Sequence, residues 1–253
     1  MDNATKRSLK KPDQFIALTE TGVHWAGEHR QKTIIAAVTL VVVVVAIVGG
    51  YSFYEHRSTA AATAFGSAMQ VYQTPVASPT QPVPPGMKTF PSAKDRAAAA
   101  NTQFVQVAHQ YSLTKDGKLA NYFAGLTYME EGQNGPAEEA FKKTASSWDS
   151  GLASLGKSSL AQLYEQTNRD AQAIDLYNDL AKGNSATFPP TLAKLQLAEL
   201  YQSQGKTEDA RKIYAQIKDS DKDAKGKPGP ASQIASEKLN PKAAAAAPGI
   251  EAQ

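Results

Sequence analysis

The longest hydrophobic stretch of the chain runs from Thr33 to Tyr54, and its 22 residues include no charge. A helix of this length measures about 33 Å, close to the ~30 Å hydrocarbon core of a bilayer. Its valines favour a strand in water, but a single segment inside lipid can satisfy its backbone hydrogen bonds only as a helix. Residues 33–54 are therefore predicted to be a transmembrane helix, longer than the apolar stretch of a cleaved signal peptide.

Lysine and arginine are distributed unevenly about this segment. Six of them lie in residues 1–32, whereas Arg57 is the only one among the first twenty residues after Tyr54. The positive-inside rule places residues 1–32 in the cytoplasm as a leader and everything after the span outside. In a bacterium this predicts a single-pass protein of the cytoplasmic (inner) membrane, with its C-terminal domain in the periplasm.

Beyond the span, an alanine-rich segment is followed by a proline-rich one. Residues 55–74 are alanine-rich, with Phe65 and Tyr72 at helical spacing, which predicts a helix leaving the membrane. Six prolines in residues 75–91 exclude a helix and predict an extended connector. A helix is expected to resume after Ser92, because serine is a good N-cap.

Residues 92–217 contain a helical pattern that repeats every 36 or 37 residues, marked by Tyr128, Tyr164 and Tyr201. A glycine or alanine lies three residues before each tyrosine. A glycine or asparagine follows it at four residues, an alanine at nine and an aromatic residue at thirteen. These columns are Gly125, Ala161 and Ala198; Gly132, Asn168 and Gly205; Ala137, Ala173 and Ala210; and Phe141, Tyr177 and Tyr214. A period of ~34 residues with such columns is the tetratricopeptide pattern, which predicts an all-α fold, an α-solenoid of about three repeats with flanking helices.

The end of the chain, residues 218–253, begins with a polar linker. A short helix is predicted over residues 231–239, and the alanine- and proline-rich tail from residue 240 is predicted to be disordered.

Composition removes several classes of function. The chain has no cysteine, four histidines and a net charge of +3. Thiolate catalysis and cysteine-ligated metals are therefore excluded, and the charge is too small for the continuous basic surface that nucleic acid requires. Because the histidines and carboxylates form no catalytic set, we expect no enzyme, no cofactor and no metal.

One motif imitates a nucleotide-binding site. Residues 151–158 satisfy the pattern G-x-x-x-x-G-K-[ST] of a phosphate-binding loop. Such a loop follows a buried strand, but residues 141–150 have the pattern of a helix end. Lys157 is therefore predicted to lie inside the first helix of repeat two, without binding nucleotide.

The order of a cytoplasmic leader, one anchor helix and an exported tetratricopeptide domain across residues 1–217 resembles the bacterial ancillary SecYEG translocon subunit family. The resemblance implies a non-catalytic scaffold that associates with the translocon and with periplasmic chaperones while they handle newly exported proteins. The alternative is a coordinator of another envelope machine, in cell division or outer-membrane assembly, that uses the same repeats.

The first helix of each repeat lines the concave side of a tetratricopeptide array. Counting from the tyrosines predicts a protein-binding groove that is apolar in repeat one and rich in acids and amides in repeats two and three. Its residues are Tyr122, Leu126, Met129, Glu130, Gln162, Glu165, Gln166, Leu195, Glu199 and Gln202. Two alternatives stay open: these residues merely solvate the groove, or the helix of residues 93–111 buries those of repeat one.

Overall fold

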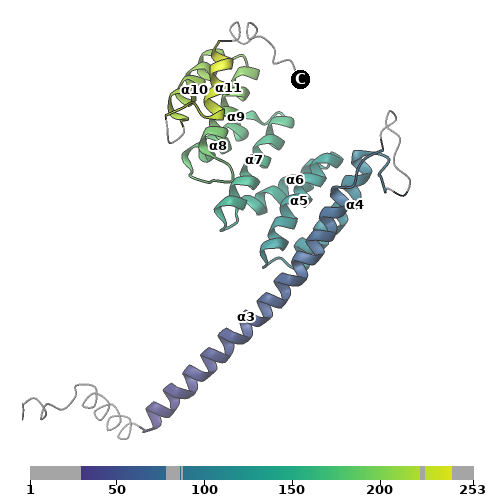
Figure 1. Cartoon of the computed structure of the whole chain (residues 1–253), viewed down its shortest axis with the longest axis vertical. Helices are drawn as coiled ribbons and strands as arrows, with labels where there is room; N and C mark the ends of the chain where they lie inside the picture. The colour runs from purple at the N-terminus through teal and green to yellow at the C-terminus, as the bar shows by residue number, and fades with distance from the viewer. Residues whose placement is uncertain (1–29, 78–85, 87, 223–225, 241–253) are drawn as a thin grey trace, which may run out of the picture. The chain divides into compact units, whose positions relative to one another are not determined.

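A computed structural model describes residues 30–77, 86, 88–222 and 226–240 (Figure 1). The regular elements of this part are all α-helices: α3 (Arg30–Tyr72), α4 (Ala93–Gln110), α5 (Lys115–Glu131), α6 (Asn134–Ala145), α7 (Ser150–Gln166), α8 (Asp170–Lys182), α9 (Pro190–Ser203), α10 (Thr207–Ser220) and α11 (Pro230–Leu239). The predicted all-α fold is confirmed. Most of the leader, the middle of the proline-rich connector and the predicted disordered tail from residue 241 lie outside the described residues.

The first of two compact units extends to His56 and is described from Arg30 onward. Here α3 carries its apolar side chains outward: Ile35, Leu40 and Ile47 are each about 65% exposed. By length and composition, α3 could cross a membrane. Such a surface of exposed valine and isoleucine is typical of a helix whose surroundings are apolar.

The second unit begins at Arg57, and the end of α3 belongs to its core. Ala61 and Ala68 are fully buried. The ring of Phe65 lies 5.8 Å from that of Phe104 on α4, which in turn stacks on Phe123 of α5 at 5.3 Å between centroids. The aromatic face at the end of α3 thus packs against α4 and α5, and the helix that the sequence predicts over residues 55–74 ends at Tyr72.

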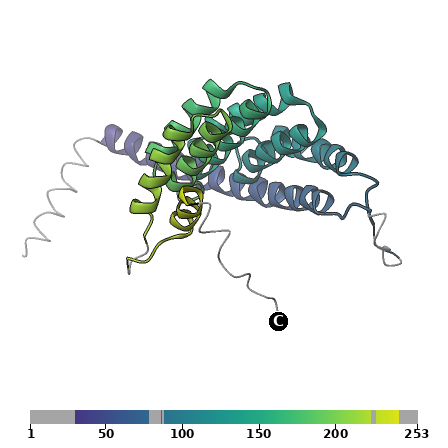
Figure 2. The ribbon, with the colours of Figure 1, turned by 90° about the horizontal axis from the view of Figure 1, so that it is seen from above.

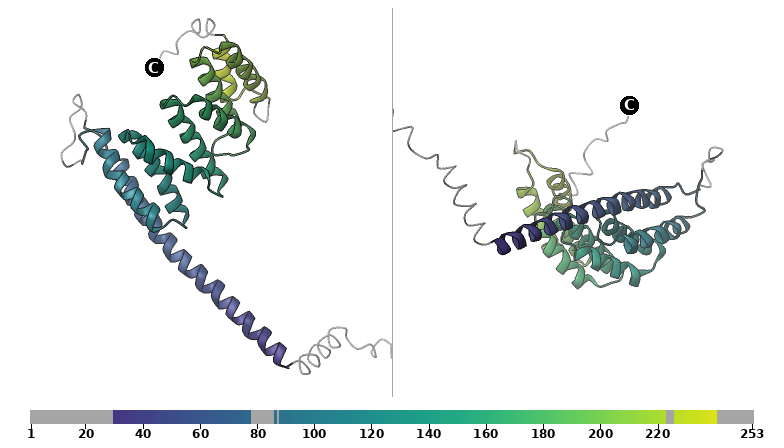
Figure 3. Two further views of the ribbon diagram at one scale, coloured as in Figure 1. Left: turned by 180° about the vertical axis from the view of Figure 1, so that it is seen from behind. Right: turned by 90° about the horizontal axis from the view of Figure 1, so that it is seen from below.

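Consecutive helices from α4 to α11 pack side by side (Figure 2). They form three hairpins, α5 with α6, α7 with α8 and α9 with α10, and α11 covers the last one (Figure 3). The turns inside the hairpins contain Gly132, Asn168 and Gly205, with φ of 80°, 56° and 74°. The left-handed conformation expected at this column is thus present in all three repeats, as is the helix–turn–helix period.

The small residues of the repeat allow the helices to approach closely. Ala137, Ala173 and Ala210 are at most 1% exposed. A Cβ on Gly125 would lie 2.6 Å from the ring of Phe141, so only glycine fits beneath this aromatic residue.

The same reason accounts for the glycine of the phosphate-loop motif. A Cβ on Gly156 would overlap the backbone nitrogen of Ala145, at the contact of α6 with α7. Lys157 lies inside α7, as predicted, and forms an ion pair with Asp179 of α8. The motif is therefore a piece of helix that packs closely on its neighbour.

Ser92 caps α4, as the sequence predicted. Ser92 accepts a hydrogen bond from the Asp95 N–H at the start of α4. The short helix expected over residues 231–239 is α11. Asp221 holds its first turn by accepting a 2.9 Å hydrogen bond from the Ser232 N–H.

Candidate protein-binding face

The first helices of the three repeats, α5, α7 and α9, carry the ten residues of the predicted groove. We call the surface of these residues the inner face. Three cavities described in the structure are lined by other residues. The contacts of the ten side chains therefore decide which of them are available to a partner.

The apolar residues of repeat one serve mainly to pack the fold. Tyr122, Leu126 and Met129 are half-buried against the core cluster that joins repeats one, two and three. The Tyr122 ring lies 6.1 Å from that of Phe141, and its hydroxyl accepts a 3.4 Å hydrogen bond from Ser159 of α7. The ring contact lies within repeat one, and the hydrogen bond joins repeats one and two. Part of each of these three side chains is therefore committed to the core.

Glu130, at the end of α5, is held by the helices that precede the repeats. It accepts a hydrogen bond from the Tyr72 hydroxyl of α3 and forms a 3.3 Å ion pair with Arg96 of α4. The Arg96 guanidinium also lies over the Tyr72 ring, at 5.2 Å. Burial, together with the hydrogen bond to Glu130, raises the pKa of Tyr72 to about 12. Glu130 thus connects α3, α4 and α5.

In repeat two, the second helix supplies a partner to the inner face. The Tyr177 hydroxyl of α8 donates a 2.5 Å hydrogen bond to Glu165 Oε1 of α7. Burial raises the pKa of Glu165, the hydrogen bond from Tyr177 lowers it, and the nearby charges of Asp170 and Glu199 raise it again. Glu165 is therefore a half-buried carboxylate with a fixed orientation.

Repeat three uses the same geometry with a neutral acceptor. The Tyr214 hydroxyl of α10 donates a 3.1 Å hydrogen bond to Gln202 Oε1 of α9. Glu199, one turn earlier, accepts a 3.3 Å hydrogen bond from Gln196. Leu195 is only 5% exposed and belongs to the core cluster of α9, α10 and α11. Its placement on the groove is therefore corrected: at this position the α9 face has turned toward α10 and α11.

The available part of the inner face lies on α7 and α9. Gln162, Gln166 and Gln202 are exposed, and Glu165 and Glu199 are half-buried between them. Carboxylate oxygens accept hydrogen bonds, and amide groups both donate and accept them. Such a face can bind the backbone of an extended polypeptide and favours segments with a positive charge.

A network that the sequence analysis missed lies between repeats one and two. Glu138 of α6 forms ion pairs with Lys142 at 2.7 Å and with Arg169 at 2.8 Å, and it accepts a 3.2 Å hydrogen bond from Tyr164. The hydrogen bonds from Arg169 and Lys142 lower the pKa of Glu138 to about 2.

A cation at a fixed position in the repeat sequence indicates this network. Arg169 lies 4.2 Å above the Tyr164 ring, and Lys206 lies 5.4 Å above that of Tyr201. Both cations follow the tyrosine of their own repeat by five residues, which forms a further column in repeats two and three, where repeat one has Gln133.

Comparisons with known proteins agree with this architecture. Two crystal structures of nearly identical TPR-like repeats, from a Podosopora anserina chain described as a putative kinesin light chain, align with TM-scores of 0.50 and 0.49. Each is 15% identical and covers 76% of this chain and 88% or 89% of the other, so the first of them shows a shared fold. A search of the curated proteins gave no match. Residues 28–241 match the family described as Tetratricopeptide repeat-like domain, and the chain therefore belongs to that family.

Proposed function

We propose that the protein is a non-enzymatic, membrane-anchored scaffold whose tetratricopeptide domain binds other proteins on the extracytoplasmic side of a bacterial inner membrane. The inner face carries the binding part of this proposal. Its exposed glutamines and its carboxylates, oriented by hydrogen bonds, suit an extended polypeptide.

The anchor part of the proposal rests on residues 33–54. Their apolar side chains are exposed in the structure, and a helix of this length matches the hydrocarbon core. The excess of lysine and arginine in residues 1–32 supports a cytoplasmic N-terminus. Protease added to spheroplasts should then digest the residues after Glu55, and their protection behind an intact membrane would contradict the topology.

Within the envelope, we propose that the partners are the secretion translocon, periplasmic chaperones and the proteins being exported. The support is the resemblance in the order of leader, anchor and repeats. An acidic, amide-rich face also suits unfolded segments, because it can pair with exposed peptide groups and with lysine or arginine side chains.

Site-specific crosslinking in cells tests the proposed partners. A photoreactive amino acid would replace Gln162, Gln166 or Gln202 in turn, and mass spectrometry would identify the crosslinked proteins. We expect translocon subunits, chaperones or exported chains from all three positions and weaker crosslinking from Gln216, an exposed residue of α10. Cell-division or outer-membrane assembly proteins would instead support the alternative coordinator, and equal crosslinking from Gln216 would contradict the inner face as the binding site.

A further inference from the structure

Two large hydrophobic side chains stand out on the surface of the second unit. Leu113 and Trp148 are 83% and 85% exposed, whereas the next most exposed large hydrophobic residue in the described part of this unit is Ile234 at 39%. Leu113 lies in the turn between α4 and α5, and Trp148 lies in the turn between α6 and α7. Exposed apolar side chains that gather at one edge of a domain can mark a surface that contacts another body.

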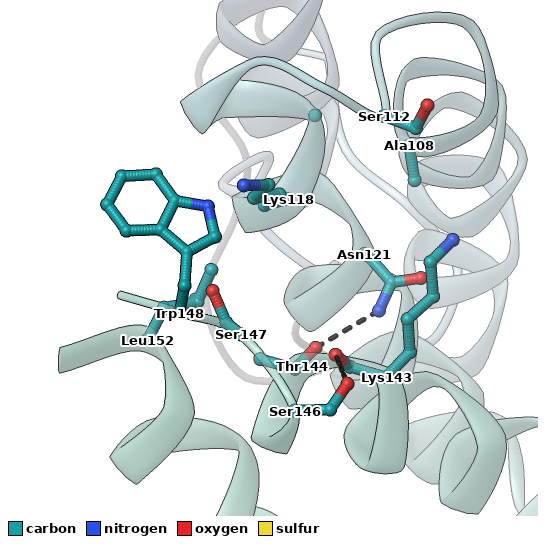
Figure 4. Close-up of a pocket in the computed structure, with 11 residues that line it drawn as sticks. Ala108, Ser112, Lys118, Asn121, Lys143, Thr144, Ser146, Ser147, Trp148 and Leu152 are labelled. Atoms are coloured by element: carbon teal, nitrogen blue, oxygen red, sulfur yellow. Dashed lines mark hydrogen bonds between the residues drawn. The ribbon is translucent and has the colours of Figure 1, made fainter. Parts of the chain in front are cut away.

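The two turns belong to one edge of the repeat stack. Ser112, the neighbour of Leu113, lines a cavity of about 190 Å³ together with Lys118 and Trp148. Lys118 Nζ lies 4.7 Å from the centre of the Trp148 ring (Figure 4). We call Tyr111, Leu113, Lys118 and Trp148 the edge patch.

Arg57, the first residue of the second unit, contacts the turn between α4 and α5. The Arg57 guanidinium donates a hydrogen bond to the carbonyl of Gln110 and lies 5.4 Å from the centre of the Tyr111 ring. Arg57 is three residues after Tyr54, so even a fully extended chain places it within about 11 Å of the end of the span. This limit holds for every orientation of the second unit.

A distance of this size is comparable with the headgroup layer, which adds about 5–8 Å on each side of the hydrocarbon core. Helical geometry, as in α3, would shorten the path to about 4.5 Å. Arg57, which contacts the turn between α4 and α5, can thus lie at the depth of the lipid headgroups.

The chemistry of the edge patch suits this layer. Tryptophan and tyrosine prefer the membrane interface, because their rings are amphipathic. Lys118 and Lys143 line the cavity, Lys115 and Asp116 open α5, and Asp149 lies in the turn before α7. Asp149 is engaged in capping α7, where it accepts a 3.0 Å hydrogen bond from the Leu152 N–H. The three lysines and two aspartates leave one net positive charge, which favours anionic lipid.

We propose that the edge patch rests on the lipid headgroups of the membrane that residues 33–54 cross, with Leu113 and Trp148 inserted among them. The proposal depends on the anchor of the proposed function, because only a membrane at the end of the span can reach the patch. Its partner is a lipid surface that contains anionic headgroups.

Tryptophan fluorescence of the full chain in vesicles tests the proposal. Trp25 and Trp148 are the two tryptophans, so Trp25→Phe leaves Trp148 as the reporter. The vesicles contain equal parts of phosphatidylcholine, brominated near the glycerol end of its acyl chains, and phosphatidylglycerol. We expect bromination to reduce the emission of Trp148 strongly, because bromine quenches only nearby rings.

The matched control moves the reporter to an exposed site outside the patch. The triple variant Trp25→Phe, Trp148→Phe, Gln216→Trp should lose little emission in the same vesicles. Equal losses from the tryptophans at positions 148 and 216 would overturn the proposal. Replacing Lys118 and Lys143 by glutamine should weaken the quenching of Trp148 in these vesicles and leave it unchanged when phosphatidylcholine is the only lipid.

Failure of the anchor gives a different result from failure of the patch. If an alkaline carbonate wash removes the chain from the vesicles, the predicted span is not an anchor. If the chain stays and Trp148 is not quenched, the patch does not touch lipid. The absence of cysteine then allows a crosslinker on Leu113→Cys to test native membranes, where capture of a protein would assign the patch to a protein partner and overturn the lipid contact.

Discussion

The Tyr177 hydroxyl donates its hydrogen bond to Glu165, twelve residues earlier in the chain, and the same separation joins Tyr214 to Gln202. Each tyrosine comes from the second helix of its repeat, and each acceptor follows the marker tyrosine of the first helix by one residue. The two repeats therefore orient an inner-face side chain by the same device, once with a charged acceptor and once with a neutral one.

This difference gives the first prediction. Tyr177→Phe should lower the free energy of unfolding by about 1.5–3 kcal/mol, the range for hydrogen bonds to charged groups, and Tyr214→Phe by about 0.5–1.5 kcal/mol. Urea unfolding of the detergent-solubilised chain, followed by circular dichroism, measures both. A larger loss from Tyr214→Phe would mean that Glu165 does not act as a charged acceptor.

The Glu138 network predicts that the stability of the domain depends on pH. The pKa of the Glu138 carboxyl falls from 4.5 in the unfolded chain to about 2 in the folded protein. Its contribution to the free energy of unfolding is therefore complete above pH 4.5 and is lost as the pH falls toward 2. Glu138→Gln should therefore lower the melting temperature at neutral pH, and the difference from the wild type should shrink through that interval. Glu139→Gln, at the exposed neighbouring residue of α6, serves as the control and should show a small difference that changes little with pH.

The close approach of α6 and α7 predicts a strong effect of one methyl group. Gly156→Ala should destabilise the domain by about 1–3 kcal/mol, because the new Cβ would meet the Ala145 backbone and force the helices apart. Gly135→Ala, in the open first turn of α6, should be neutral or stabilising by up to ~1 kcal/mol. Thermal unfolding of the two variants distinguishes a tight helix contact from a general intolerance of alanine for glycine.

The phosphate-loop motif predicts a negative result. Because Lys157 is paired with Asp179 on the surface of two helices, Lys157→Ala should cost less than about 1 kcal/mol of stability. Calorimetric titration of the full chain with magnesium and ATP should give no binding heat with either lysine or alanine at this position. Binding that Lys157→Ala abolishes would contradict the non-enzymatic function.

The period of the sequence was enough to predict the repeats, because the residue type in each column is required by the backbone or the packing at that position. Asn168 and Gly205 mark left-handed turns, and Ala173 marks a helix crossing. The partners of the inner face could not be predicted in this way. Glu130 is held by Tyr72 and Arg96, which come from helices outside the repeat, and no offset within a period connects these residues.

Leu195 shows a second limit. Its helical position matches that of an inner-face residue, but the face of α9 that it occupies is covered by α10 and α11. Ser158 holds the same position in repeat two, six residues before its tyrosine, and is also only 5% exposed. This position therefore faces the core in both repeats, which the spacing of the tyrosines alone did not show.

The proline-rich connector between α3 and α4 has paired ends. The Ala77 N–H donates a 2.8 Å hydrogen bond to the Phe90 carbonyl, and the Phe90 N–H donates a 3.0 Å bond to the Pro75 carbonyl. A segment whose two ends are paired can change in length without shifting either helix. Doubling the length of a flexible loop raises the entropic cost of closing it by only about 0.6 kcal/mol. An epitope, a fluorescent protein or a newly evolved binding motif inserted between the paired residues Ala77 and Phe90 should therefore leave the packing of α3 and α4 unchanged.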